Sequence, residues 1–280
     1  MHLIMILVTL GLAFSLRLLP FDFTGNWTQR WQKTLLLFLF PPLLLLVTAF
    51  AILYMGADGK MFWLKAGWFS YLLAIGFLGY TCFCLLRLTY QGWQSWRQVR
   101  TYSQQEIAGN TARILQAALP YSTQIGFWKP ELVVSEGLLD SLDLDHLQAV
   151  LAHEQAHYHH RDTFWFFWLG WLHSCTYWLA NSESLWQELL LLREMRADRD
   201  AAVQVDPLLL AEALLTVASA PLKFTQSYCA SLSCATPRNR LAERIDALLS
   251  QPETPVTSSF WSWTWLLFVF LPLITVPFHQ

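Results

Sequence analysis

Charged side chains are scarce in this sequence. They make up 14% of its 280 residues, against about 25% in an average soluble domain, whereas hydrophobic residues make up 55%. The formal net charge is only −2, and no basic stretch with interleaved aromatic residues stands out. Direct binding of nucleic acid is therefore not expected. A chain so poor in charge and so rich in apolar residues is expected to fold partly in a lipid bilayer.

Cysteines are too few and too scattered to form a disulfide framework. There are five, an odd number, and three of them lie in or beside apolar runs, so they predict packing residues rather than cross-links or a Cys-rich metal site. Tryptophan, in contrast, is abundant, with 15 residues. Indole rings gather where a membrane meets water, because the ring is apolar and its N–H stays hydrated. The tryptophan content therefore indicates extensive membrane contact.

Four apolar stretches are near the roughly 20 residues that a helix needs to cross the hydrocarbon core. Three lie within residues 1–86 and one within residues 258–280, whereas residues 87–257 have the mixed composition of a soluble domain. The sequence therefore predicts three N-terminal transmembrane helices, a folded domain and a C-terminal transmembrane helix. The four stretches are residues 3–19, 35–55, 67–86 and 260–278.

Basic residues are concentrated on one side of these predicted spans. They flank the first connection and follow the third span, whereas the second connection has only Lys60 and Lys65. Because connections rich in Lys and Arg stay in the cytoplasm, the domain of residues 87–257 is expected at the cytoplasmic side of the cell membrane and both chain ends on the outer side. The basic residues are Arg17, Arg30, Lys33, Arg87, Arg97, Arg100 and Arg113.

A fifth apolar run, residues 163–180, lies inside the predicted domain. It separates two segments that are expected, as argued below, to meet at one metal ion, so a single crossing there would put them on opposite faces of the membrane. The run is therefore expected to dip into the near leaflet, to lie along the interface or to pack inside the domain. Four tryptophans suit an interfacial position: Trp165, Trp168, Trp171 and Trp178.

The clearest chemical signal is the run His-Glu-Gln-Ala-His, which starts at His153. Asp143 can cap a helix through this run. On that helix, His153 and His157 are four residues apart and project from the same face, so both imidazoles can reach one tetrahedral Zn²⁺. Glu154 lies about 100° around the helix, where it can take a proton from a water molecule at the metal without being a ligand. The alternative, a polar helix face with solvated histidines, is the weaker interpretation.

A catalytic zinc needs a third protein ligand and one open position. His159 and His160 extend the histidine cluster but are expected to be surface or interfacial residues. The next suitable ligand is Glu194, in a helix predicted from residue 184 to about residue 203. Asp198 lies four residues further on the same face, where it could accept the second N–H of a ligand histidine and fix its tautomer.

Glu194 and Asp198 could instead belong to a solvated helix face, paired with the three arginines of the same segment. That alternative would be favoured for the segment alone. The upstream His-Glu-x-x-His pattern reverses the preference, because it lacks one carboxylate ligand that this segment can supply. The sequence therefore predicts one zinc ion per chain. Its predicted ligands are His153, His157 and Glu194.

These motifs resemble those of the BlaR/MecR-type membrane metallopeptidases. The resemblance rests on residues 153–162, on residues 126–134 before them and on the segment from Glu194 to Asp198, and the architecture is similar over roughly residues 1–278. It implies a mainly α-helical, multi-pass membrane protein with a small α+β, zincin-like core of the gluzincin type. It also implies zinc ligation by the three residues above, a general base at Glu154 and a supporting role for Asp198.

The same resemblance implies a strand at the edge of the sheet that holds the substrate in extended form, a use of unpaired backbone groups that is physically sensible. The residues implied are Lys129, Pro130, Glu131, Leu132, Val133 and Val134.

Two departures limit what the resemblance implies. The family's β-lactam sensors have a penicillin-binding domain after the last span, and this sequence has none there, so direct binding of β-lactams is not expected. The related HtpX-type peptidases often have His-Pro before a late Arg-Ile, where this chain has Thr236-Pro237 before Arg244-Ile245. The residue that stabilises the oxyanion is therefore left open: Arg240 and Arg244 are candidates and could equally be surface charges.

The sequence thus predicts a membrane-embedded zinc endopeptidase that cleaves a protein at the cytoplasmic face of the membrane. The resemblance suggests regulated proteolysis in signalling, with a transcriptional repressor as one expected substrate. One alternative is HtpX-like turnover of damaged membrane proteins. Another is a non-catalytic metal-binding receptor or scaffold, against which Glu154 argues, because a structural metal site has no use for a carboxylate placed as a base.

Overall fold

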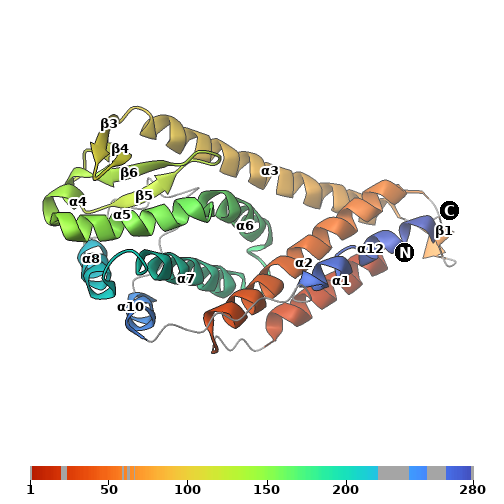
Figure 1. Cartoon of the computed structure of the whole chain (residues 1–280). Helices are drawn as coiled ribbons and strands as arrows, with labels where there is room; N and C mark the ends of the chain where they lie inside the picture. The colour runs from red at the N-terminus through yellow and green to blue at the C-terminus, as the bar shows by residue number, and fades with distance from the viewer. Residues whose placement is uncertain are drawn as a thin grey trace. The chain divides into compact units, whose positions relative to one another are not determined.

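The fold is known from a computed structural model and is mostly helical, with a small mixed sheet (Figure 1). Its chain divides into two compact units. Unit 1 comprises residues 1–86, 171–189 and 253–280, and unit 2 comprises residues 87–170 and 190–252. Residues 171–189, which the sequence placed in the central domain, thus group with the N-terminal helices. The structure describes residues 2–19, 24–58, 60–61, 64–65, 67–219, 240–250 and 263–278.

Unit 1 is built around helices α1 (His2–Leu18) and α2 (Trp27–Met55), which pack against each other. Asn26 caps α2, because its side chain accepts a hydrogen bond from the Gln29 N–H at 2.9 Å. The helix continues through the Pro-Pro pair at residues 41–42, as expected for a helix with packed neighbours. Two short strands, β1 (Lys60–Met61) and β2 (Leu64–Lys65), then lead to α3 (Trp68–Val99).

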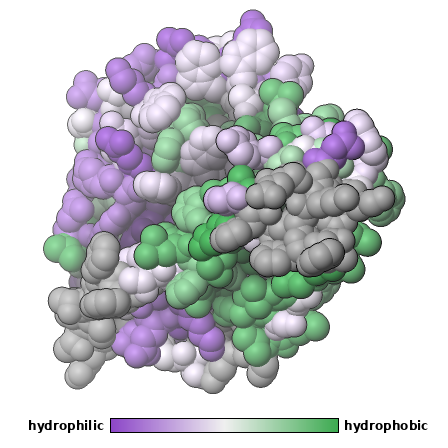
Figure 2. Space-filling model, turned by 90° about the vertical axis from the view of Figure 1, so that its right-hand side faces the viewer, coloured by the Kyte–Doolittle hydropathy of each residue, from purple (hydrophilic) through white to green (hydrophobic). Residues whose placement is uncertain are grey.

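Helices α2 and α3 are the two described helices that are long and apolar enough to cross a membrane. Helix α1 is also apolar but has only 17 residues. Unit 1 exposes many large apolar side chains, and Figure 2 shows a broad apolar area on one face of the molecule. Exposed apolar area of this kind indicates contact with a membrane or a partner. The most exposed side chains in unit 1 include Leu7, Val8, Tyr54, Trp68 and Phe69.

The predicted span at residues 260–278 does not form one helix among the residues that the structure describes, which here begin at residue 263. Instead there are three short pieces: α11 (Trp265–Phe268), α12 (Leu271–Ile274) and the 3₁₀ helix η4 (Val276–Phe278). Pro272 and Pro277 explain the difference, because each lacks the N–H that a continuous helix needs. One continuous helix is thus not present in residues 263–278, whereas the membrane location of this segment stays a prediction.

Unit 2 contains a four-stranded mixed sheet with the strand order β3-β4-β6-β5. Strands β3 (Ser103–Ile107) and β4 (Asn110–Leu115) form a hairpin whose two turn residues, Ala108 and Gly109, both have positive φ, as a tight two-residue hairpin turn requires. β5 (Ser122–Ile125) pairs antiparallel with β6 (Glu131–Ser135), which is parallel to β4.

The prediction that residues 129–134 form an edge strand is wrong. Lys129 and Pro130 precede β6, and the remaining residues belong to β6, which pairs with β4 on one side and with β5 on the other. The burial of Leu132 to Ser135 on both faces fits an interior strand. The strand at this edge of the sheet is β5, and it is also the strand that contacts the helix carrying the His-Glu-x-x-His run.

Helix α5 (Leu144–His159) lies along the sheet, and Figure 1 shows α7 and α8 on its other side. Asp143 caps α5 as predicted, accepting a hydrogen bond from the His146 N–H at 2.9 Å. The core between the sheet, α5 and α8 is apolar throughout, so it fixes α5 against the strands. Its buried members are Ala112, Leu132, Val134, Leu138, Leu147, Val150, Leu151 and Ala213.

The remaining helices are α4 (Glu136–Ser141), α6 (Asp162–Thr176), α7 (Ser182–Ala201), α8 (Pro207–Ser219) and α10 (Leu241–Leu249). Helix α7 starts two residues before the predicted residue 184. The apolar run of residues 163–180 forms most of α6 and the turn after it. Its position relative to a membrane stays a prediction.

Candidate metal centre

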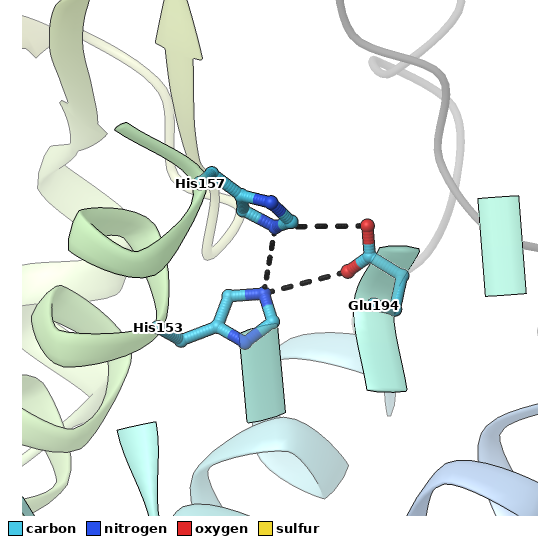
Figure 3. Close-up of side chains that lie close together, drawn as sticks. All are labelled: His153, His157 and Glu194. Atoms are coloured by element: carbon cyan, nitrogen blue, oxygen red, sulfur yellow. Dashed lines mark hydrogen bonds and ion pairs between the residues drawn. The ribbon is translucent and has the colours of Figure 1, made fainter. Parts of the chain in front are cut away.

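Helix α5 places the two histidines of the His-Glu-x-x-His run side by side. His153 and His157 lie one turn apart, their rings are perpendicular with centroids 4.7 Å apart, and their Nε2 atoms are 3.1 Å apart. Figure 3 shows both rings turned toward the carboxylate of Glu194. This arrangement follows from the helix period, since residues four apart share a face.

Helix α7 supplies the carboxylate. One oxygen of Glu194, Oε2, lies 3.4 Å from His153 Nε2, and the other, Oε1, lies 3.6 Å from His157 Nε2. The ligand atoms of the three residues all lie within 4.8 Å of one another, close enough to hold a metal ion. Glu194 is buried, so it is not part of a solvated helix face, and that alternative interpretation of the segment is wrong.

The spacing of the two Nε2 atoms suits a tetrahedral site. With metal–ligand bonds of about 2.0–2.1 Å, as for zinc, neighbouring donor atoms lie about 3.3–3.4 Å apart. The separation of the two Nε2 atoms, 3.1 Å, is close to that value, and each atom lies 3.4–3.6 Å from a different oxygen of Glu194. Two imidazoles with one carboxylate are also the donor set of many catalytic zinc sites. The three side chains therefore converge on one position and have the donor atoms that such an ion needs.

Each histidine contacts a carboxylate through its other ring nitrogen. His153 Nδ1 lies 2.8 Å from Asp198 Oδ1, a close ion-pair contact rather than an aligned hydrogen bond. His157 Nδ1 bonds to Asp162 Oδ2 at 2.7 Å. Such partners fix the ring orientation and the tautomer, so that Nε2 faces the metal position. The predicted contact of Asp198 with a ligand histidine is thus present in the structure.

Asp162 is a functional residue that the sequence-based argument missed. It is the first residue of α6, and Arg161 before it has a positive φ of 54°, which turns the chain back toward α5. Asp162 is also paired with Arg196 of α7, which lies between Glu194 and Asp198 in the sequence. The available signal was the Arg-Asp pair that follows the histidines, but spacing alone could not show that this turn returns Asp162 to His157.

Arginines surround the carboxylates of the site. Arg244 of α10 donates from Nε and Nη2 to Asp198 at 2.8 and 2.7 Å, and its Nη1 lies 3.4 Å from Glu194 Oε2. Arg193 donates twice to Glu194 Oε1, at 2.9 and 2.6 Å. The contact of Arg244 with both oxygens of Asp198 is the strong, bidentate form of the carboxylate–arginine interaction, whereas Arg193 meets a single oxygen of Glu194.

Arg244 is buried and bonded to Asp198. The interpretation of Arg244 as a surface charge is therefore wrong. The donors of Arg244 are engaged with Asp198 and Glu194, which does not favour the other interpretation, a role at the oxyanion. Arg240 pairs with Glu243 one turn further along the chain. Thr236 and Pro237 lie outside the described residues.

Glu154 is buried beside the histidines and contacts the edge strand. Ser122 of β5 donates a hydrogen bond from Oγ to Glu154 Oε1 at 2.8 Å, and Gln124 Nε2 lies 3.4 Å from the Glu154 backbone oxygen. His159 is exposed, and His160 bonds to Asp200 at 2.5 Å, so neither joins the metal-binding group. The contact from Ser122 was not predicted, because the partner strand of α5 could not be read from the sequence.

Comparison with known families leads to the same region of the chain. Residues 112–232 match the model of peptidase family M48. The match runs from β4 through α8 and includes the residues that meet at the centre, except Arg244. It supports a metallopeptidase function for this region. No curated protein and no solved structure matches the chain significantly. The narrower resemblance to BlaR/MecR-type proteins stays a prediction.

The electrostatics of this M48-like region are those of a buried, charge-balanced cluster. Burial alone would lower the pKa of His153, but the neighbouring carboxylates of Asp198 and Glu194 outweigh it and raise that pKa to about 10 in the metal-free protein. Burial would raise the pKa of Glu194, yet the charges of Arg193, His157 and Arg244 hold it well below its usual value. The carboxylates are thus kept ionised, as metal ligation requires.

Burial also opposes the charge on Asp198, but Arg244 and His153 hold its pKa below the usual value. The same holds for Asp162, whose pKa is lowered by His157 and the neighbouring arginines in spite of burial. Both groups that orient the histidines are therefore negative and can accept hydrogen bonds from the rings.

The raised pKa of His153 predicts a loss of stability at alkaline pH in the metal-free protein. The protonated ring stabilises the fold below its ordinary pKa of 6.5, and this contribution disappears as the pH rises toward about 10. We expect the thermal unfolding midpoint of chelator-treated protein to fall over this range. Zinc should reduce the fall, because the metal binds the neutral ring.

Asp198→Asn is the matched control, because it removes the carboxylate that raises the pKa of His153. Its unfolding midpoint should start lower but change less between pH 6.5 and 10. A midpoint of the metal-free wild-type protein that stays constant over this range, or falls as steeply in Asp198→Asn, would contradict the assignment of the charge to His153.

Proposed function

We propose that this protein is a membrane-anchored zinc endopeptidase. The observation that carries the proposal is the group of His153, His157 and Glu194, whose donor atoms face one point while Glu154 lies next to His153 on the same helix. The match of residues 112–232 to peptidase family M48 supports it. A zinc ion held by these three ligands would supply Lewis acidity, which polarises a peptide carbonyl and makes water more acidic.

Glu154 is the proposed general base. Its Oε1 accepts the hydrogen bond from Ser122, and no described residue bonds to Oε2, so Oε2 is the oxygen that can accept the proton of the attacking water. The same carboxyl group can then give the proton to the leaving amine. Ser122 fixes the orientation of the carboxylate, which gives the edge strand a direct role in positioning the base. The donor that stabilises the oxyanion is not assigned.

Strand β5 is the proposed binding edge for the substrate. It pairs with β6 on one side only and contacts the helix of the catalytic residues. The backbone groups on its other side can therefore pair with an extended segment of a protein substrate. This places the substrate beside Glu154, and it replaces the predicted edge strand at residues 129–134.

Helices α2 and α3 support a membrane location, because both are long and apolar enough to span a bilayer. The distribution of Lys and Arg supports unit 2 on the cytoplasmic side of a multi-pass protein. There the enzyme would perform regulated proteolysis, with a transcriptional repressor as one candidate substrate. Comparison of the proteomes of cells with wild-type or inactive enzyme distinguishes this role from turnover of damaged membrane proteins, since a single accumulating regulator supports signalling.

Replacement of the base tests the mechanism. Glu154→Gln keeps the size and the hydrogen-bonding capacity of the side chain but cannot accept a proton, so zinc content should persist while the cleavage rate falls by about 10²–10⁴-fold. Asp198→Asn should act differently and reduce metal affinity or activity by about 10–100-fold, with partial recovery at high zinc. If Glu154→Gln cleaves as fast as the wild type, the peptidase mechanism is wrong and the scaffold hypothesis replaces it.

Topology mapping tests the location. Single cysteines introduced at Gln104 and Ser250 should both be labelled by impermeant thiol reagents only from the cytoplasmic side, because unit 2 contains both residues and a bilayer cannot divide one folded unit. A cysteine at Gln280 should be labelled from outside. Labelling of residues 104 and 250 from opposite sides would contradict a shared metal centre, and labelling of both from outside would contradict the proposed orientation.

A further inference from the structure

Five aromatic side chains form a cluster where the loop after β5 meets α6 in unit 2. The ring of Phe127 lies 5.0 Å from that of Phe164 and 6.3 Å from that of Trp168. Trp128 lies 5.3 Å from Phe164, which in turn lies 5.1 Å from Trp165. We refer to these five residues as the aromatic patch. The chemistry of the metal centre makes no use of them.

Three tryptophans of the aromatic patch are exposed, although the exposed surface of a soluble domain is usually rich in polar side chains. Trp128 is 75% exposed, Trp165 is 59% exposed and Trp168 is 37% exposed. From residue 163 to residue 170, α6 has no charged side chain, although Thr163, Phe166, Phe167 and Leu169 already form its buried side. A helix that is apolar on all sides is normally covered by protein or lipid. The exposed rings therefore need an apolar environment.

Two exposed cations border the aromatic patch in the sequence. Lys129 follows Trp128 directly, and Arg161 lies three residues before Phe164. Neither forms an ion pair with any other residue in the described parts of the chain. Indole rings with neighbouring Lys and Arg are the combination that binds at a bilayer surface, where the rings enter the interface and the cations meet anionic headgroups.

The chain connects unit 2 directly to a candidate membrane span. The predicted span of residues 67–86 lies almost entirely in helix α3, one of the two candidate membrane spans, and residues 87–102 connect it to β3. The end of this helix has a similar composition, because Arg97 stacks on Trp93 and Arg100 stacks on Trp96 with distances of 4.8 and 4.7 Å to the ring centroids. A bilayer that contains α3 would therefore always be within reach of unit 2.

We propose that the aromatic patch inserts into the interfacial zone of the bilayer and docks unit 2 on the membrane surface, with Lys129 and Arg161 contacting anionic headgroups. The docking itself does not depend on the metal. Its consequence for catalysis rests on the proposed function: β5 ends at Ile125, two residues before Phe127, so docking would hold the substrate-binding edge close to the headgroups. The enzyme would then favour extended segments that lie next to the membrane.

Site-directed spin labelling of the full-length protein in lipid nanodiscs tests the docking. Single cysteines are introduced by Trp128→Cys and Trp165→Cys after replacement of the five native cysteines. Leu144→Cys is the matched control, because Leu144 is an apolar residue of unit 2 that is 62% exposed. It begins α5, about 22 Å along the helix axis from the end that leads to α6. Each variant must retain the circular-dichroism spectrum and the thermal unfolding midpoint of the parent, which shows that the protein has folded.

The readout is the accessibility of each label to oxygen, which dissolves in lipid, and to a water-soluble nickel chelate. We expect the oxygen-to-nickel ratio at positions 128 and 165 to exceed that at position 144 several-fold. A ratio equal to that of the control would show that the patch faces water and would overturn the proposal. Low accessibility to both reagents would mean that the patch is covered by protein, and it would overturn the proposal as well.

Removal of the cations tests the headgroup contact. In nanodiscs with anionic lipid, Lys129→Gln and Arg161→Gln should each lower the ratio of docked to undocked unit 2 by about fivefold, the effect of one basic residue near an anionic surface. Arg199→Gln, at an exposed arginine of α7, should have no such effect. An equal loss with Arg199→Gln, or no loss in any variant, would contradict the contact. Failure of catalysis would leave these measurements unaffected, so the two proposals fail separately.

Discussion

The structure of unit 2 depends on the balance of charge in its buried centre. Two histidines, three carboxylates and three arginines meet between α5, the start of α6, α7 and α10, in a region that the apolar core otherwise seals. Burial of an unpaired charge is costly, and loss of one partner from a buried ion pair typically costs about 3–5 kcal/mol. The same buried ion pairs therefore contribute to the packing of these helices and to the geometry of the candidate metal centre. Loss of one carboxylate or arginine would leave its partner charged and buried, and the same contacts point the histidines toward a single position.

The two histidines are oriented by similar chains of contacts from different elements. His153 contacts Asp198, which is bonded to Arg244. In the same way, His157 bonds to Asp162, which is paired with Arg196. In each chain an arginine keeps the carboxylate ionised, and the carboxylate holds Nδ1 of the ring. The Nε2 atoms are thereby placed before a metal arrives, which reduces the reorganisation that binding requires. Glu154 is held in a different way, by Ser122 of β5, so the base is positioned by the strand proposed to bind the substrate.

Much of the centre could be predicted from the sequence, because its central features are local. The helix period places His153 and His157 on one face, and a carboxylate ligand with a second acidic residue one turn later is visible at Glu194 and Asp198. The outer contacts could not be predicted in the same way. Arg244 lies 46 residues beyond Asp198 in the sequence, and Asp162 reaches His157 only because the chain turns at Arg161.

The edge strand and the C-terminal helix were predicted incorrectly because both depend on features that local apolar patterns do not report. The strand order places β6 inside the sheet through parallel pairing with β4, and no local pattern separates an interior strand from an edge strand of this length. Hydropathy predicted one continuous C-terminal helix without regard to Pro272 and Pro277, which interrupt helical hydrogen bonding. Sequence patterns identified residues that meet at the centre, whereas tertiary pairing determined which strand and which arginines contact them.

The central claim is that His153, His157 and Glu194 hold one metal ion. Zinc K-edge X-ray absorption of purified, zinc-loaded protein tests it most directly, because the spectrum reports the atoms bound to the metal. The account predicts nitrogen and oxygen ligands only, at about 2.0–2.1 Å, with two imidazoles in the wild type and one in His157→Ala. Sulfur ligands at about 2.3 Å, or two imidazoles that persist in His157→Ala, would contradict it.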